Sequence, residues 1–220
     1  MKLRALIGCE ESGVVRNEFL AIGHDAWSND LIPARNGGPH IQKCVKKAIV
    51  EDGPWDIIIL HPECTALSLS GNRWYGIGMP RHQERLDAIE WTKDLWELSK
   101  QHARIGCALE NPTGVIWQHI GKPQYIQPYQ FGHGETKKTG ILTHNLPPLK
   151  PTNIVDGRET RIWKMAPGPN RKRDRSETFR GIAQAMAQQY TEQLSPKGYI
   201  ECDVIACNCG GYHKKVDDEV

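Results

Sequence analysis

Cys64 stands in a loop that follows a continuous apolar run, Trp55–Leu60. The loop begins with His61, Pro62 and Glu63, and Cys64 comes next. A run this apolar is typical of a strand buried on both faces of a parallel sheet. Functional groups gather in the loops at the ends of such strands. A cysteine there can act as a nucleophile through its thiolate, although a single cysteine is also commonly a small buried apolar residue. The residue type alone leaves both interpretations open.

A carboxylate follows the next apolar segment along the chain. Residues 105–109 form that segment, and Glu110 comes directly after it, before Asn111 and Pro112. A carboxylate at the end of a buried strand is costly unless it has a partner or a task. Because the carboxyl ends of parallel strands meet at one edge of the sheet, we expect Glu110 to lie close to Cys64.

A third group of polar residues follows the first two predicted strands, residues 3–9 and 24–30. A tight turn before a helix N-terminus, with a carboxylate at the end of the next strand, suits a ligand that contains adenosine, because the carboxylate can accept hydrogen bonds from ribose hydroxyls. The full G-x-G-x-x-G pattern is absent, so ordinary strand–turn–helix punctuation is an equal alternative. The candidate ligand-binding residues are Gly8, Glu10, Ser12, Gly13, Asp30 and Pro62.

The elements that position these residues alternate between strands and helices. Helical spacing of apolar residues predicts helices near 14–22, 83–101 and 181–190, and residues 146–168 are predicted to be an irregular, proline-rich connector. This alternation predicts an α/β fold with a Rossmann-like, doubly wound and mostly parallel sheet. We predict a single catalytic domain over residues 1–194 and an appended tail over residues 195–220.

Composition and charge are those of an ordinary globular chain. The 220 residues are 39% hydrophobic and carry a net charge of +2, so the overall charge does not indicate a nucleic-acid partner. No secretory signal and no apolar run long enough to cross a bilayer is present, which predicts a cytoplasmic protein without a membrane partner. One local basic run could contact phosphate or be a solvated surface: Arg171, Lys172, Arg173 and Arg175.

The tail places four soft metal ligands close together, Cys202, Cys207, Cys209 and His213. Three thiolates and an imidazole would satisfy the tetrahedral coordination of a structural zinc ion. The spacing lacks the usual paired C-x-x-C motifs. A disordered tail with oxidisable cysteines is therefore the alternative.

The order of these motifs resembles that of the DNA cytosine-5 methyltransferase family, in the compact versions typical of bacteriophage and prophage genomes. Pro62–Glu63–Cys64 resembles the family's Pro-Pro-Cys loop, and Glu110–Asn111–Pro112 resembles its Glu-Asn-Val motif. The match continues through Phe131–Gly132 with Lys137 and Lys138, Arg158–Glu159–x–Arg161, and the segment that begins at Ser176. The resemblance covers roughly residues 3 to 190, and an ordered set of motifs is more specific than any single one.

The resemblance implies a class I fold that depends on S-adenosylmethionine, and methylation of cytosine at C5 in DNA. It implies that Cys64 attacks C6, that Glu110 contacts N3, and that Lys137 lies near the base. Lys138 and the basic run would contact the phosphates of duplex or single-stranded DNA. Protection of phage DNA from restriction, in the cytoplasm or nucleoid of a host cell, is the role that the resemblance suggests.

Four departures from the family pattern leave alternatives open. Glu63 replaces a proline beside the nucleophile, Lys43–Cys44 replaces a Gly-Asp step that helps to hold adenine, and Thr139 replaces an arginine. The segment before Arg158 is also too short for a target-recognition domain, which predicts low or unusual sequence specificity or a protein partner that supplies target recognition. The alternatives are modification of a free cytosine nucleotide, or an inactive methyltransferase-like module that binds DNA or a protein.

Overall fold

The computed structural model describes residues 1–192, 199–201 and 212–214. Its strands are β1 (Arg4–Gly8), β2 (Asp25–Asp30), β3 (His40–Gln42), β4 (Trp55–Leu60), β5 (Ala103–Pro112), β6 (Gln124–Ile126), β7 (Thr139–His144), β8 (Tyr199–Glu201) and β9 (Tyr212–Lys214). Its α-helices are α1 (Val14–Ala21), α2 (Val45–Glu51), α3 (Asn72–Tyr75), α4 (His82–His102), α5 (Trp117–Ile120), α6 (Arg161–Lys164), α7 (Arg171–Ser176) and α8 (Arg180–Glu192). No helix of the described residues is both long and apolar enough to span a membrane.

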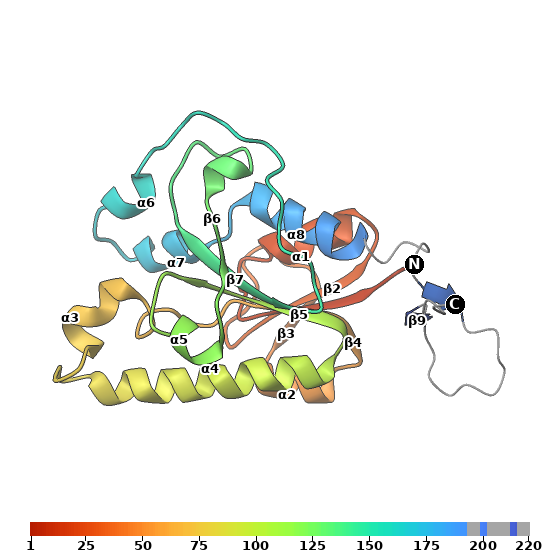
Figure 1. The fold of residues 1–220 in the computed structure, drawn as a ribbon, viewed down its shortest axis with the longest axis horizontal. Helices are drawn as coiled ribbons and strands as arrows, with labels where there is room; N and C mark the ends of the chain where they lie inside the picture. Colours follow the sequence, from red (N-terminus) through yellow and green to blue (C-terminus); the bar gives the residue numbers. More distant parts are fainter. Residues whose placement is uncertain (193–198, 202–211, 215–220) are drawn as a thin grey trace, which may run out of the picture.

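The first seven strands form one sheet with the order β3-β2-β1-β4-β5-β7-β6 (Figure 1). Strands β1 to β5 pair in parallel, and β7 is antiparallel to both β5 and β6. The order reverses between β1 and β4, and sheets of this kind bind ligands at the carboxyl ends of the strands beside such a reversal. This confirms the predicted α/β fold with a Rossmann-like, doubly wound and mostly parallel sheet.

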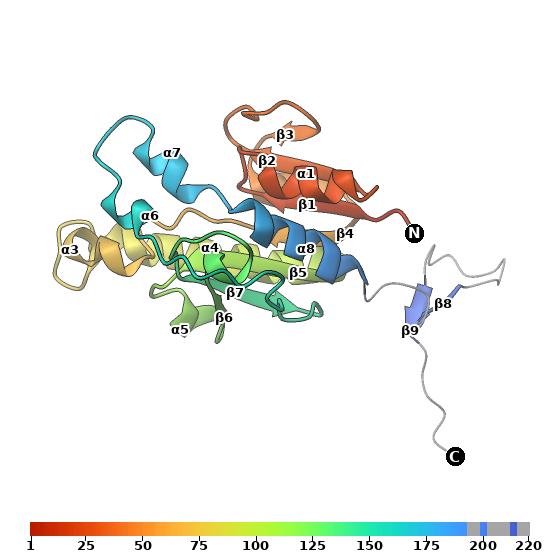
Figure 2. The same ribbon diagram turned by 90° about the horizontal axis from the view of Figure 1, so that it is seen from above.

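Helices cover both faces of the sheet, as Figure 2 shows from above. Helices α1 and α8 pack on one face and α2 and α4 on the other, which gives two separate apolar clusters. All six residues of β4 are buried, as the unbroken apolar run predicts. Along this strand Ile57 and Ile59 join the first cluster, while Ile58 and Leu60 join the second. The alternation follows from the two-residue period of a strand.

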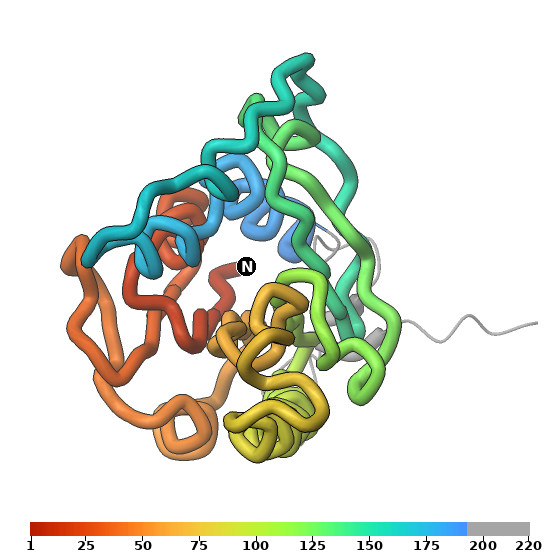
Figure 3. The backbone as a smooth tube through the Cα atoms, turned by 90° about the vertical axis from the view of Figure 1, so that its left-hand side faces the viewer, coloured from red at the N-terminus to blue at the C-terminus, as the bar shows by residue number. Residues whose placement is uncertain are grey.

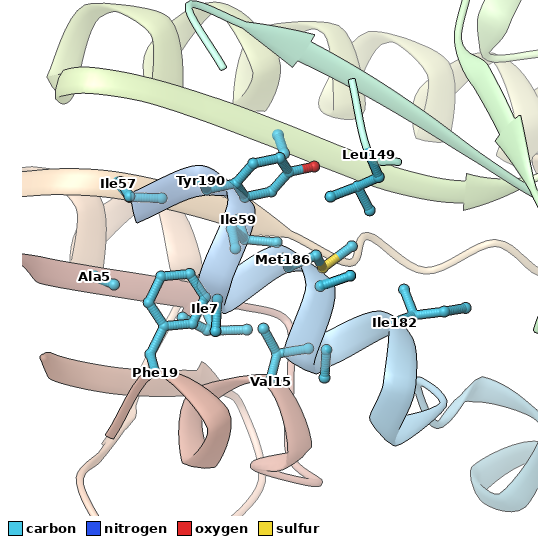
Figure 4. Close-up of a cluster of buried hydrophobic side chains, with 14 of the residues drawn as sticks. Ala5, Ile7, Val15, Phe19, Ile57, Ile59, Leu149, Ile182, Met186 and Tyr190 are labelled. Atoms are coloured by element: carbon cyan, nitrogen blue, oxygen red, sulfur yellow. The ribbon is translucent and has the colours of Figure 1, made fainter. Parts of the chain in front are cut away.

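Tyr190 is an exception within the first cluster. Its ring lies among apolar side chains of α1, α8 and the central strands (Figure 4), and its hydroxyl is buried without a hydrogen-bond partner in the described structure. An unsatisfied buried hydroxyl costs about 1–3 kcal/mol. We expect Tyr190→Phe to raise the free energy of unfolding by about 1 kcal/mol in urea denaturation. Tyr125→Phe on the exposed strand β6 is the matched control, and a loss of stability in Tyr190→Phe would contradict the prediction.

The structure differs from the sequence prediction mainly at sheet ends. Strand β5 continues through Pro112, so Glu110 lies within the strand instead of after it, and it pairs with Ile141 of β7. The predictions did not include β3, β6 or β7. These are short strands whose pairing depends on distant segments, so local periodicity carries little signal for them. The connector between residues 146 and 168 is irregular as predicted, apart from the single turn of α6.

The carboxyl ends of the parallel strands all point toward one side of the molecule. Figure 3 views that side, where the loops after β1, β2 and β4 and the segment that carries α6 and α7 are arranged around the ends of the central strands. The candidate residues after β1, β2 and β4 therefore share one edge, as the topology of a doubly wound sheet requires.

Candidate active site

The loop after β4 presents Cys64 in a tight turn. Its carbonyl oxygen accepts hydrogen bonds from the backbone N–H groups of Leu67 at 3.1 Å and Ser68 at 2.8 Å. Pro62, just before it, is buried, whereas the Cys64 side chain is only partly buried. Cys64 is thus held by backbone geometry at the edge of the sheet, with its sulfur still accessible.

Arg85 of α4 binds the same loop through its guanidinium group. Its guanidinium donates to the carbonyl oxygens of Ala66 at 2.7 Å and Ser68 at 3.3 Å, and to the Asn72 side chain at 2.8 Å. Arg85 is buried, with 6% of its surface exposed. The sequence analysis missed this residue. Its spacing of four residues from the buried Ile89 could have revealed it, because the two share one face of a helix.

The Cys64 loop also binds the segment that contains Glu110. The Asn111 side chain is fully buried and donates a hydrogen bond of 3.0 Å to the Pro62 carbonyl. Further along, Ser68 forms a β-bridge with Gly114, where a Cβ atom would lie 2.2 Å from the Leu67 carbonyl oxygen. Only glycine permits this close approach. These contacts therefore hold the Cys64 loop against the end of β5.

Glu110 contacts His61 across the two strands. The distance from His61 Nδ1 to Glu110 Oε2 is 3.7 Å, and the two side chains are only 11% and 17% exposed. Burial alone would raise the pKa of Glu110. The adjacent His61 imidazole and the charge of Lys137 outweigh that effect, so the pKa of Glu110 lies below its usual range.

Lys137 enters the site from the segment just before β7. Its ammonium donates to the Glu177 carbonyl oxygen at 3.1 Å and lies within 3.5 Å of the Ser176 carbonyl oxygen, at the C-terminal end of α7. Burial lowers the pKa of Lys137, and the charges of Glu110 and Cys64 oppose that shift. Lys137 thus lies close enough to Glu110 and Cys64, the other two residues predicted to be catalytic, for their charges to act on its ammonium.

The Cys64 thiol is protonated at rest in this environment. Burial raises the pKa of Cys64, and the nearby Glu110 carboxylate raises it further, whereas the Lys137 ammonium lowers it. Glu63 has the smallest of these effects. Burial raises the pKa of the Cys9 thiol to about 12 and that of Cys107 to about 11, so those two thiols are even less prone to ionise at neutral pH.

We expect alkylation of Cys64 by iodoacetamide to be slow at pH 7 and to accelerate as the pH rises, because the thiolate is the reactive form. Glu110→Gln removes a negative charge and should increase the rate at pH 8 several-fold, whereas Lys137→Met should decrease it. Mass spectrometry of the Cys64 peptide measures each rate separately from the other cysteines. Equal rates in the two variants would contradict the described electrostatics.

Glu63, which departs from the family pattern, is neutralised by a distant residue. Its carboxylate forms an ion pair with Lys172 of α7 and accepts a 2.8 Å hydrogen bond from the Thr65 hydroxyl. The hydrogen bond from Lys172 holds the pKa of Glu63 below its usual range. A carboxylate next to Cys64 in sequence would oppose formation of the Cys64 thiolate if it were unpaired. In the structure Glu110 has the larger effect on Cys64.

The predicted ligand-binding turn after β1 is organised around Glu10. Its buried carboxylate accepts hydrogen bonds from the backbone of Val15 at 2.7 Å and from the Ser12 hydroxyl at 3.2 Å, and it caps α1. Gly13 takes a left-handed conformation with φ 70°, and an added Cβ would lie 2.2 Å from the buried Arg16 guanidinium. Gly8 packs against the side chains of Val45 and Leu60. These residues shape the end of β1.

Asp30 ends β2 beside this turn. Its Oδ1 accepts hydrogen bonds from Leu31 at 2.7 Å and Ile32 at 3.3 Å, while Oδ2 has no hydrogen-bond partner among the described residues. Lys43, which departs from the family pattern, pairs with Glu51 and Asp52 at the end of α2. Lys43, where the family has another residue, therefore has a structural role here: it pairs with the acidic residues at the end of α2.

The predicted nucleic-acid-binding residues fall on two segments. The basic run forms α7, where Arg171 binds the Met165 carbonyl, Lys172 pairs with Glu63, and Arg173 pairs with Asp174. Arg175 is close enough to affect Lys137 electrostatically. The exposed Lys138 lies over the ring of Tyr125, 4.4 Å from its centroid.

The predicted metal ligands Cys202, Cys207 and Cys209 lie outside the described residues, and of His213 only the backbone, in β9, is described. Within the part of the chain that the structure covers, no group of three or more His, Cys, Asp or Glu side chains is placed to hold a metal ion. The structure gives no support to the zinc prediction.

No family model matches the sequence, and no curated protein matches it. Several solved structures are similar, among them three methyltransferases. A DNA modification methyltransferase encoded within a prophage of E. coli has 13% identity and a TM-score of 0.44, covering 64% of this chain and 46% of that one. The Entamoeba histolytica methyltransferase EhMeth has 12% identity and a TM-score of 0.48, covering 77% and 62%. The S. pombe Dnmt2 methyltransferase has 13% identity and a TM-score of 0.41, covering 74% and 54%. This chain thus spans less than two thirds of the length of each.

Proposed function

We propose that this protein is a methyltransferase that transfers a methyl group from S-adenosylmethionine to C5 of cytosine in DNA. The observation that carries the proposal is the clustering of Cys64, Glu110 and Lys137 at the carboxyl edge of the parallel strands, where the charges of Glu110 and Lys137 both act on the Cys64 thiol. A thiol nucleophile beside a carboxyl group and a cation is the equipment needed to activate an unreactive pyrimidine carbon.

The chemistry divides among these three residues. The Cys64 thiolate adds to C6 of cytosine, and the electron pair displaced from the C5–C6 bond makes C5 nucleophilic. A proton delivered by Glu110 to N3 neutralises the negative charge that develops on the ring. Lys137 offsets negative charge close to both groups. After methyl transfer, water accepts the C5 proton, the C–H electron pair re-forms the C5–C6 double bond, and the C6–S pair leaves with Cys64 as its thiolate.

The residues at the end of β1 and β2 fit the methyl donor. The Asp30 carboxylate lies at the carboxyl ends of the strands where the strand order reverses, and one of its oxygens has no partner among the described residues, so ribose hydroxyls could donate to it. Gly8, Ser12, Gly13 and Pro62 would border the same ligand, and the buried Glu10 would fix the turn that holds it. When bound there, S-adenosylmethionine would supply an electrophilic methyl group.

The segment between Lys138 and Arg158 belongs to the core of the fold. It forms β7 and then a connector, and Phe131 forms a β-bridge with Asn153. These residues leave no chain for a separate module that reads base edges in this place. We therefore propose that the protein acts with low sequence specificity, prefers single-stranded DNA, or depends on a protein partner for target recognition.

The α7 helix is expected to contact phosphates without reading sequence. Replacing both Arg173 and Arg175 by glutamine should weaken binding of a DNA oligonucleotide about equally for all sequences. The slope of log affinity against log salt should fall by roughly 0.9 for each lost phosphate contact on duplex DNA. Fluorescence anisotropy across a salt series measures both quantities. Lys47→Gln on α2 is the control, and an unchanged slope in the double variant would exclude α7 as a contact surface.

The proposed activity can be tested directly with S-adenosylmethionine that carries a heavy-isotope methyl group. The protein is incubated with duplex DNA, single-stranded DNA or free cytosine nucleotides, and the products are analysed by mass spectrometry of nucleosides. Heavy 5-methylcytosine in DNA is the expected result. Label only in free nucleotides would replace the proposed substrate, and no label in any base would exclude cytosine methylation by this protein.

A further inference from the structure

His61 occupies a position between two buried carboxylates. Its Nδ1 is 3.7 Å from Oε2 of Glu110, and its charge is close enough to lower the pKa of Glu10 against the effect of burial. Its backbone N–H donates to the Gly8 carbonyl oxygen at 2.9 Å, which joins β4 to β1. The imidazole thus lies between the loop after β1 and strand β5. The His61 side chain is only 11% exposed.

The second ring nitrogen of His61 is unusual for a buried polar atom. Nε2 is buried and has no hydrogen-bond partner among the described residues. Most buried polar atoms are paired, and a specific exception calls for a physical reason. Simple packing does not require an imidazole here, because an apolar side chain would avoid the cost of the unpaired nitrogen. A role in holding or moving a proton gives that reason.

The chemistry proposed for Glu110 needs such a proton. To act as an acid toward N3, Glu110 must carry a proton when the base arrives, yet its pKa lies below its usual range because His61 and Lys137 favour its ionised form. At neutral pH the carboxyl group alone would be without a proton. Histidine is the side chain best suited in general to take up and pass on a proton, and the His61 Nδ1 lies 3.7 Å from Glu110 Oε2.

We propose that His61 is a positioning residue that supplies, through Glu110, the proton that reaches N3 of the base. This inference rests on the proposed function. The N–H bond of the His61 imidazolium breaks as an O–H bond forms on Glu110, and the Glu110 proton passes to N3. His61 ends neutral and Glu110 ends as a carboxylate, while N3 carries the proton. When Cys64 leaves, the proton returns along the same path.

The groups that face this pair come from every neighbouring element. Glu10 lies on the loop after β1, Cys64 on the loop after β4, and Lys137 on the segment before β7. All three remain in place when only His61 is changed. The kinetic test therefore uses the ratio of kcat in a His61 variant to kcat in the unchanged protein, which removes the pH dependence that the two proteins share.

The kinetic test compares His61→Asn with the unchanged protein from pH 5.5 to 9, with labelled S-adenosylmethionine and DNA. Removing His61 leaves only Glu110 to hold the proton, so the kcat ratio should fall as pH rises, by about tenfold over this range. A purely structural role gives a ratio that is the same at all pH values, and that result overturns the proposal. His119→Asn, on the exposed face of α5, is the matched control. In a Glu110→Gln background, His61→Asn should cause no further pH-dependent loss.

A second measurement does not depend on methyl transfer. In the unliganded protein, the carboxyl carbon resonance of Glu110 reports its titration by NMR. His61→Asn should raise the pKa of Glu110, because a neighbouring imidazole that favours the carboxylate is removed. An unchanged Glu110 titration overturns the proposal whether or not the protein methylates DNA. A raised pKa in a protein that transfers no methyl group would instead place the failure in the proposed function.

Discussion

Replacing Cys64 by serine is expected to abolish transfer of labelled methyl groups to DNA, with a loss of kcat on the order of 10⁴-fold or more. A serine hydroxyl is a much weaker nucleophile than a thiolate at neutral pH, and no other described residue of the cluster can form the bond to C6. The substitution changes one atom in a partly buried side chain, and the backbone hydrogen bonds of the turn do not involve the sulfur. Single-turnover incorporation of heavy methyl groups measures the effect.

Two controls separate loss of the nucleophile from loss of structure. Binding of S-adenosylmethionine by calorimetry should be nearly unchanged in Cys64→Ser, because the proposed donor contacts lie at the ends of β1 and β2. Cys107→Ala, a substitution of a buried cysteine in β5, should lower stability while leaving methyl transfer within a few-fold of the original. If Cys64→Ser kept activity within tenfold, the covalent mechanism would be wrong.

Glu110→Gln should lower kcat by roughly 10²–10⁴-fold, the usual contribution of a positioned general acid. Glutamine can occupy the same position and accept a hydrogen bond, but it cannot deliver a proton to N3. The same substitution removes the negative charge that raises the pKa of Cys64, so thiol alkylation should become faster. Activity and thiol reactivity therefore move in opposite directions, which general damage to the site would not produce.

Glu63→Gln is the matched control for this second variant. It removes a carboxylate next to Cys64 in sequence, but one that is exposed and paired with Lys172. Its effect on methyl transfer should stay within a few-fold. Equal losses in Glu63→Gln and Glu110→Gln would mean that local charge, and not proton transfer by Glu110, controls the rate.

The pH dependence of stability provides a further check on Glu110. Its pKa in the folded protein lies below its usual value, so its ionised form stabilises the fold at pH values above the unfolded pKa. That contribution is lost as the pH falls through the folded pKa. Glu110→Gln should accordingly reduce the dependence of unfolding free energy on pH in the acidic range.

Local sequence patterns predict the central parallel strands and the edge of the sheet that carries Cys64 and Glu110. The unbroken apolar run of β4 and the apolar segment of β5 predict parallel strands buried on both faces. Once those strands are parallel neighbours, the residues that follow them must share an edge, so the proximity of Cys64 and Glu110 follows from local patterns and one topological rule. Local signals suffice here because the burial of each strand shows in its own apolar residues. The alternation of strands with helices along the chain indicates that these strands run in parallel.

The balance of charges in the site depends on the tertiary structure and could not be predicted from local sequence patterns. The pairing of Glu63 with Lys172, the contact of Lys137 with the Glu177 carbonyl, and the support of the Cys64 loop by Arg85 all join segments far apart in the chain. The length of β5 and its pairing with β7 likewise depend on a partner strand that carries little local signal. Charged and polar groups have many potential partners of similar type, and which of them meet depends on how the chain closes over the sheet. An apolar run can be buried against many different apolar neighbours and needs no specific partner. The sequence therefore predicts the strands that carry this site better than the pairing of its charged groups.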